Sequence, residues 1–120
     1  MAKSLRTPAQ KTEEYRAKVM ELNDAFRRSF EGGKLFMTAN VANLASDVQA
    51  MALRKVATYA DFDEDDNPWG EHDFGAFDLA GQKFFWKIDY YDKDMEYGSN
   101  DPADPEKTTR VLTLMFAEDY

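Results

Sequence analysis

The chain has 120 residues, of which 43% are hydrophobic, 14% aromatic and 32% charged, which is typical of a globular domain and not of a disordered chain. It contains no cysteine, and this excludes disulfide scaffolds, thiolate metal sites and cysteine nucleophiles. The net charge is −8, but residues 1–60 carry +4 (ten Lys/Arg, six Asp/Glu) and residues 61–120 carry −12 (five against seventeen). We expect one domain over residues 1–120, with residues 1–6 as a flexible N-terminus.

The first predicted helix starts at the segment Thr7-Pro8-Ala9-Gln10. This segment offers an N-cap hydroxyl, a proline at the first helical position and a glutamine three residues after the cap. Apolar residues then recur at intervals of three and four, and Gly32-Gly33 is a stop signal. The pattern predicts an amphipathic helix whose buried stripe is Tyr15, Val19, Leu22, Phe26 and Phe30.

A short apolar segment, residues 34–38, follows as a candidate strand. From Asn40 the helical period returns and continues to about Tyr59, which predicts a single second helix. Residues 61–70 break every periodicity and predict an acidic loop. The apolar side of the second helix would consist of Val41, Leu44, Val48, Met51 and Val56.

Two runs with strand character, residues 71–79 and 82–92, flank Ala80-Gly81 and predict a β-hairpin. A two-residue turn there would pair residues whose numbers sum to 161, although alanine is a poor first residue for such a turn and a longer loop is the alternative. The core face would then pair Phe77 with Phe84, Gly75 with Trp86 and Asp73 with Ile88. The other face would pair Asp78 with Lys83, Ala76 with Phe85, Phe74 with Lys87 and His72 with Asp89.

A last strand, residues 110–117, places Leu112, Leu114 and Phe116 on one side. The predicted fold class is therefore α+β, with two amphipathic helices packed on a three-stranded antiparallel sheet. Residues 34–37 are the candidate for a fourth strand at one edge. The expected core packs Phe77, Phe84, Trp86 and Ile88 against Leu22, Phe26, Leu44 and Val48.

Two segments of the second half stand out, Gly70-Glu71-His72-Asp73-Phe74-Gly75 and Trp86-Lys87-Ile88-Asp89-Tyr90-Tyr91-Asp92. With them, the chain from about Leu22 to Tyr120 resembles a family of short bacterial proteins of unknown function. The resemblance implies kinship and supplies no activity, cofactor or catalytic residue.

His72, the only histidine, lies between Glu71 and Asp73 and is predicted to face Asp89 across the hairpin. A carboxylate in that place would hold the imidazole in one tautomer, as a general base or a metal ligand requires. Catalytic zinc usually takes two or three histidines, so a metal here would be a hard cation bound by carboxylates. Three interpretations stay open: a structural cross-strand hydrogen bond, part of a binding surface, and a catalytic group.

The acidic loop resembles a calcium loop at its first, third and fifth positions, Asp61, Asp63 and Asp65. Its sixth position is Asp66, where glycine is required, and its twelfth is His72, where a glutamate is required. These two differences exclude an EF-hand. A solvated acidic loop is the preferred interpretation, with weak cation binding as the alternative.

The charge distribution carries the main functional expectation. No stretch approaches the roughly 20 apolar residues of a membrane helix, and the start lacks a signal-peptide segment, so we expect a cytoplasmic protein without membrane contact. The acidic half repels a phosphate backbone and attracts basic proteins, which disfavours direct nucleic-acid binding.

We therefore expect a small non-enzymatic interaction protein with a basic protein partner. One such partner is a nucleic-acid-handling or defence complex, inhibited by acidic side chains that stand in for phosphates. No catalytic residue, metal site or cofactor is assigned. The candidate binding residues are Asp61, Asp63, Asp65, Asp66, Glu71, His72, Phe85, Lys87, Asp89 and Tyr91.

Two other functions remain as alternatives. The first is a metal-assisted hydrolase in which His72, Asp73 and Asp89 act with Lys87 as an electrostatic stabiliser. The second is a structural accessory subunit without a site. A hydrolase would require the four side chains to converge in a concave pocket, whereas a binding module would present them on a flat sheet face.

Overall fold

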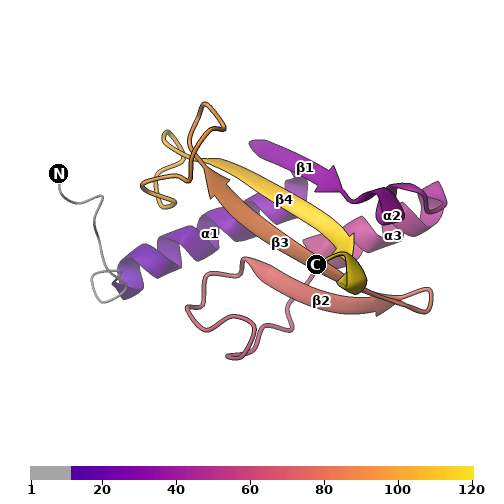
Figure 1. Cartoon of the computed structure of the whole chain (residues 1–120). Coiled ribbons are helices and arrows are strands. Elements are labelled where there is room, and N and C mark those ends of the chain that lie inside the picture. The colour runs from indigo at the N-terminus through magenta and orange to yellow at the C-terminus, as the bar shows by residue number, and fades with distance from the viewer. Residues whose placement is uncertain (1–11) are drawn as a thin grey trace.

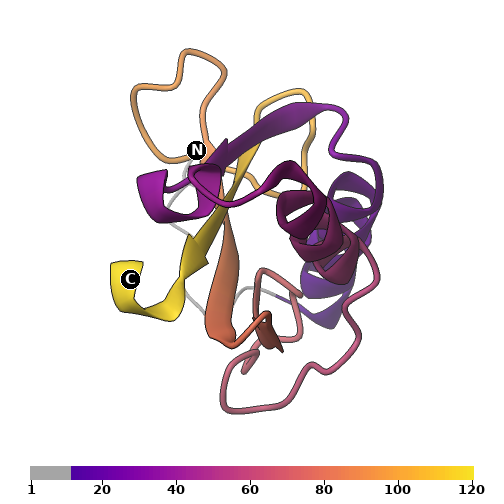
Figure 2. The same ribbon diagram turned by 90° about the vertical axis from the view of Figure 1, so that its right-hand side faces the viewer.

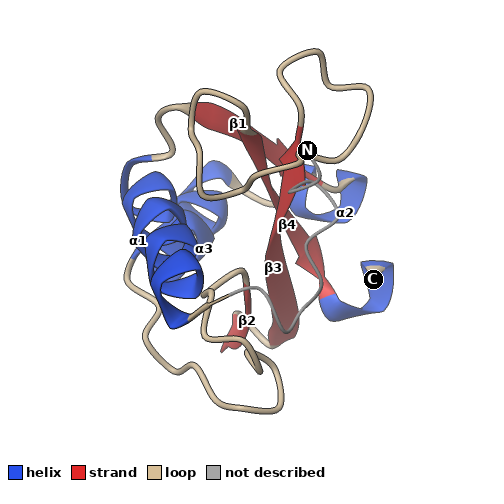
Figure 3. Cartoon of the chain, turned by 90° about the vertical axis from the view of Figure 1, so that its left-hand side faces the viewer, coloured by secondary structure: helices blue, strands red, loops and turns tan. Residues whose placement is uncertain are grey.

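The computed structural model describes residues 12–120 and shows an α+β fold built on a four-stranded sheet (Figure 1). The strand order is β1 (Gly33–Met37), β4 (Thr109–Phe116), β3 (Gln82–Tyr91) and β2 (Phe74–Leu79). Helices α1 (Glu13–Ser29) and α3 (Ser46–Ala57) lie together on one side of this sheet (Figures 2 and 3). The predicted α+β class and the candidate fourth strand are thus confirmed.

The sheet is mixed, and the prediction of an antiparallel sheet is wrong for one strand pair. β3 is antiparallel to both β2 and β4, but β1 runs parallel to β4, with Gly33 opposite Arg110 and Met37 opposite Leu114. The chain between β1 and β4 includes two helices and the whole hairpin. A connection of this length allows β4 to pair with β1 in either the parallel or the antiparallel direction. Local periodicity does not specify which of the two is formed.

Helix α1 begins at Glu13, and Thr12 caps it by accepting a hydrogen bond on its Oγ1 from the Tyr15 backbone N–H at 3.1 Å. Phe30 ends it in a left-handed conformation (φ 59°), two residues before the predicted glycine stop. The predicted helix start at residues 7–10 and the predicted flexible segment, residues 1–6, lie outside the described residues.

The predicted second helix is in fact two helices. α2 (Ala39–Ala42) and α3 are separated by residues 43–45. The Gln49 side chain stabilises the break because its Nε2 donates to the carbonyls of Ala42 and Leu44, each at 2.9 Å. Val41 and Val56 of the predicted stripe are buried, but in α3 Ala52 is buried in place of Met51, which is exposed.

The hairpin follows the predicted register. Ala80 (φ 54°) and Gly81 (φ 80°) are both left-handed, as a two-residue type I′ turn requires, so the longer loop is not used. The strand pairing runs from Leu79 with Gln82 to Phe74 with Lys87, and one further backbone hydrogen bond, from the Ile88 N–H to the Asp73 carbonyl at 2.9 Å, extends it to the predicted pair Asp73 and Ile88. The expected strand pairing of His72 with Asp89 is therefore not formed.

The core lies between the sheet and the helices, and its largest fully buried side chain is Trp86. Gly75 stands opposite, and a Cβ at this position would overlap the Trp86 indole. Phe84 and Ile88 are buried as predicted, but the expected helix partners Leu22 and Val48 are only half-buried. The core cluster is Phe26, Val41, Ala52, Val56, Phe84, Trp86, Ile88, Leu112, Leu114 and Phe116, with Phe77 and Leu44 at its margin.

No helix within residues 12–120 has the length and apolar character needed to cross a lipid bilayer.

Candidate functional site

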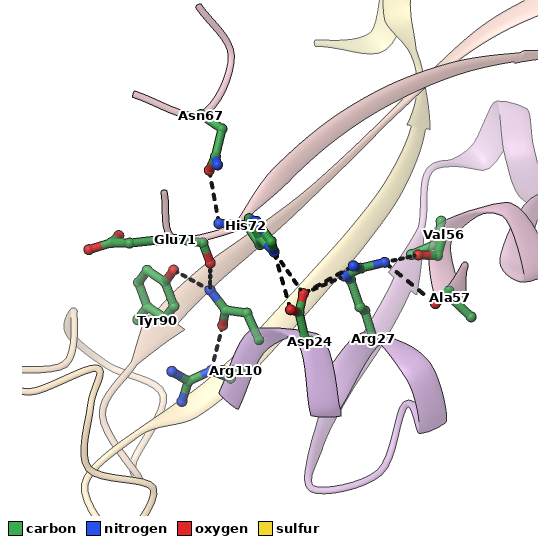
Figure 4. A network of polar contacts seen from close by, with 10 residues as sticks. Asp24, Arg27, Val56, Ala57, Asn67, Glu71, His72, Tyr90 and Arg110 are labelled. Atoms are coloured by element: carbon green, nitrogen blue, oxygen red, sulfur yellow. Dashed lines mark hydrogen bonds and ion pairs between the residues drawn. The ribbon is translucent and has the colours of Figure 1, made fainter. Parts of the chain in front are cut away.

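His72 turns away from the sheet and contacts helix α1 (Figure 4). Its backbone is left-handed (φ 59°), and its Nδ1 lies 3.1 and 3.2 Å from the two carboxylate oxygens of Asp24. The predicted pairing with Asp89 is wrong, because the β2–β3 ladder ends at Phe74 and the left-handed turn redirects the imidazole. His72 therefore ties the loop before β2 to the first helix.

The same loop is fixed by two further contacts of His72. The imidazole stacks on the Phe62 ring with 3.7 Å between ring centroids and an interplanar angle of 3°. The His72 backbone N–H donates to Asn67 Oδ1 at 2.8 Å, which closes the loop on itself. The acidic segment between Phe62 and Asn67 is thus held at both of its ends.

Asp24 also connects α1 to α3 through Arg27. Arg27 Nε donates to Asp24 Oδ1 at 3.0 Å, and Nη1 donates to the carbonyls of Val56 at 2.8 Å and Ala57 at 3.4 Å. Arg27 is buried, and its guanidinium supplies donors to carbonyls of the last turn of α3, where the Val56 carbonyl also accepts from the Tyr59 backbone N–H at 3.3 Å. One carboxylate therefore holds the loop and both large helices together.

Asn23 is fully buried and uses all of its side-chain hydrogen-bonding groups on distant parts of the chain. Its Oδ1 accepts from Arg110 Nε at 2.7 Å, and its Nδ2 donates to Tyr90 Oη at 2.8 Å and to the Glu71 carbonyl at 2.9 Å. These bonds join α1 to β3, β4 and the segment before β2 (Figure 4). With every group of the Asn23 amide bonded to a different part of the chain, these contacts fix one arrangement of the elements.

Burial changes the acidity of the groups beside Asn23. Desolvation raises the pKa of the Asp73 carboxyl, and the hydrogen bond that the Tyr90 hydroxyl donates to it at 3.3 Å acts in the opposite direction. Desolvation likewise raises the pKa of the Tyr90 phenol, and the nearby Asp73 charge adds to this. Desolvation lowers the pKa of the Arg110 guanidinium.

We expect Asp73→Asn to unfold less readily than the wild type at pH 7. Because the folded-state pKa of Asp73 is raised above the ordinary value of 3.8, the folded state binds more protons than the unfolded state in the interval above that value. Wild-type stability is therefore lost as the pH rises through the folded-state pKa. The variant lacks this dependence, so its advantage in urea unfolding should shrink as the pH is lowered towards about 4.

Asp78→Asn is the matched control, since Asp78 is exposed in β2. A difference between Asp73→Asn and the wild type that is constant with pH, or a variant less stable at pH 7, would contradict this assignment.

The remaining predicted site residues lie elsewhere. Phe85, Lys87, Asp89 and Tyr91 alternate with the buried residues of β3 and therefore lie on the sheet face opposite α1 and α3. There Lys87 Nζ forms an ion pair with Asp89 Oδ2 at 3.0 Å. The four side chains proposed for a hydrolase are thus divided between two faces of the sheet. Residues 12–120 hold no group of three His, Asp or Glu side chains arranged for a metal ion.

Sequence reasoning missed Asn23, Asp24, Arg27 and Arg110, the residues that form the network. The sequence carries a signal for three of them. Asn23 and Arg27 follow Val19 at steps of four, on the buried side of α1, and Arg110 alternates with Leu112 and Leu114 on the core face of β4. Polar residues at such core positions indicate a buried hydrogen-bond network, because a buried polar group needs a partner.

A family model described as "Protein of unknown function (DUF3768)" matches residues 37–119. The match supports the expected resemblance to a family of unknown function, over a shorter range than residues 22–120. No curated protein and no solved structure matches the chain.

Proposed function

Since the chain belongs to the family DUF3768, whose function is unknown, we propose its role from its own surface: a small non-enzymatic protein that binds a basic protein partner. We define the acidic loop as Asp61, Asp63, Glu64, Asp65 and Asp66. The observation that carries the proposal is that these five side chains are exposed and that none forms an ion pair with any residue of 12–120. Their charge is therefore available to a partner.

The anchoring of this loop supports a role in binding. Phe62 stacks on His72, Tyr59 donates its hydroxyl to the Asp61 carbonyl at 3.3 Å, and Asp63 Oδ1 accepts from the Asp66 backbone N–H at 2.9 Å. A loop that is already ordered loses less conformational entropy when a partner binds. Within the proposal, His72 and Glu71 position the loop, and the aspartates contact the partner.

The nature of the partner follows from charge. Clustered exposed carboxylates attract a basic surface and accelerate its encounter with the protein. The basic surfaces that bind nucleic acids match such a cluster, because lysine and arginine that pair with phosphates also pair with carboxylates. We therefore propose a nucleic-acid-handling or defence complex as the partner, inhibited because the acidic loop occupies its phosphate-binding surface. Phe85, Lys87, Asp89 and Tyr91, on the outer sheet face, would form a separate contact area.

The hydrolase alternative gains no supporting observation. His72 and Asp73 contact α1 and Tyr90, whereas Lys87 and Asp89 pair with each other on the other side of the sheet.

The proposal is tested by removing the charge of the acidic loop. In the variant Asp61→Asn, Asp63→Asn, Asp65→Asn, Asp66→Asn, we expect the fold to persist, because exposed loop side chains contribute little packing. Proteins captured by the wild type from the native host, quantified by mass spectrometry, should be depleted with this variant. The association rate of the purified partner should fall with the variant and, for the wild type, with added salt.

A matched control changes the net charge equally at scattered exposed positions: Glu21→Gln, Asp78→Asn, Asp94→Asn and Glu106→Gln. This control should retain the partner. Duplex DNA added to the wild-type complex should release the partner if the loop stands in for phosphates. Equal capture by wild type and loop variant, or an association rate that does not change with salt, would refute the acidic-loop mechanism. A complex that DNA does not disturb would refute the phosphate mimicry.

A further inference from the structure

A cleft of about 470 Å³ lies between α1 and the residues that precede β4. Its volume falls within the roughly 300–1,000 Å³ of small-molecule sites. Its wall is largely apolar, and it lies apart from the acidic loop, none of whose residues lines it. The residues around it are Leu22, Ala25, Phe26, Ser29, Glu31, Gly32, Pro105, Thr108 and Arg110.

Arg110 is the cation of this cleft, and it is buried without a carboxylate partner. Its Nε donates to Asn23 Oδ1 and one terminal nitrogen, Nη2, donates to the Pro102 carbonyl. No carboxylate of residues 12–120 lies within ion-pair distance of its guanidinium. The guanidinium carbon lies 5.3 Å from the centroid of the Tyr90 ring, and the charge of Glu71 acts on it from beyond ion-pair distance. A buried arginine is usually paired directly with an anion, and such a direct partner is missing here among residues 12–120.

The other terminal nitrogen of Arg110, Nη1, has donors to offer. It forms no hydrogen bond within residues 12–120. Nη1 is not one of the side-chain atoms of residues 12–120 that are both fully buried and without a hydrogen-bond partner. Because it has no partner, it must keep some solvent-accessible surface. A guanidinium carries five N–H donors, of which two are used here.

We propose that this cleft binds a small organic monocarboxylate with an apolar body. The carboxylate would accept from Arg110 Nη1, and the apolar body would pack against Leu22 and Phe26. Burial lowers the pKa of the Arg110 guanidinium, and a bound anion would offset the desolvation that causes this.

The surroundings favour one negative charge over several. Glu31 also lines the cleft and would repel a second charge on the ligand. The Thr108 hydroxyl donates to the Asp101 carbonyl and the Ser29 hydroxyl to the Ala25 carbonyl, so neither offers its proton to the ligand. A phosphate needs more donors than Nη1 supplies, which makes a carboxylate the better match.

The probe for this proposal is phenylacetate, titrated into the ¹⁵N-labelled protein, with phenylacetamide and inorganic phosphate as comparison ligands. We expect saturable amide shifts at Leu22, Phe26 and Thr108 with phenylacetate. The neutral amide should bind about tenfold more weakly, because it lacks the charge that pairs with Arg110. Phosphate should not perturb these amides.

Two variants locate the binding without touching the buried network. Ala25→Phe fills the cleft from an exposed position of α1 and should abolish binding, whereas Ala17→Phe, exposed on the same helix and outside the cleft, should not. Glu31→Gln should tighten phenylacetate binding about twofold, since it removes a screened repulsion. Equal affinity for phenylacetate and phenylacetamide, binding retained in Ala25→Phe, or the same shifts with phosphate would each overturn the proposal.

Discussion

We expect Trp86→Ala to lower the free energy of unfolding by about 3–5 kcal/mol, the range for removing a large aromatic side chain from a core. The Trp86 indole is 0% exposed. It packs edge to face against the rings of Tyr59 and Phe62, with 5.6 and 6.1 Å between ring centroids. The guanidinium carbon of Arg27 lies 5.6 Å from the centroid of the Trp86 ring. Gly75 opposite has no side chain that could move into the space. The cavity would therefore stay open.

The test compares the free energies of unfolding of Trp86→Ala and Phe85→Ala, each measured by denaturant titration. Phe85 is the neighbouring residue in β3, but it lies half-buried on the outer face of the sheet. There its ring packs against those of Phe74 and Tyr120, with 5.1 and 5.7 Å between ring centroids. Phe85→Ala should cost clearly less, because part of the ring surface is already in water. Similar losses for both variants, or a loss below about 1 kcal/mol for Trp86→Ala, would mean that the faces of the sheet are assigned the wrong way round.

Asn23→Ala should destabilise the protein on the order of 3 kcal/mol, although it removes only a single amide group. The substitution leaves Arg110 Nε without its acceptor and deprives the Glu71 carbonyl and the Tyr90 hydroxyl of a donor. A buried polar group without a partner costs about 1–3 kcal/mol, and more if charged. The effect is large because three polar groups from distant parts of the chain lose a hydrogen bond at once.

Asn43→Ala is the control for Asn23→Ala. Asn43 is exposed after α2, and its replacement should change the free energy of unfolding by less than about 0.5 kcal/mol. The two variants are measured by the same denaturant titration. If Asn23→Ala were as mild as the control, the hydrogen bonds of Asn23 would not hold the helix to the sheet.

The hairpin shows how much of the fold the sequence alone determines. Alternation of apolar residues defines the faces of β3, and the distance between two strand-like runs defines the turn, so Phe77 opposite Phe84 and Gly75 opposite Trp86 follow from local pattern. The first helix is determined in the same way, since Val19 and Phe26 are buried on the predicted stripe. For the site, the exposure of the acidic loop is the part that composition predicts.

Only the tertiary structure decided the direction of β1 and the partner of His72. β1 lies beside β4, more than seventy positions away along the chain, and no local pattern states in which direction so distant a strand returns. His72 meets Asp24, 48 residues before it, and not Asp89, because a left-handed turn and the packing of α1 place the imidazole. Periodicity reports which face of an element is buried. The element that covers this face is selected by the packing of the whole chain, and the polar network of Asn23, Asp24, Arg27 and Arg110 exists only after that selection.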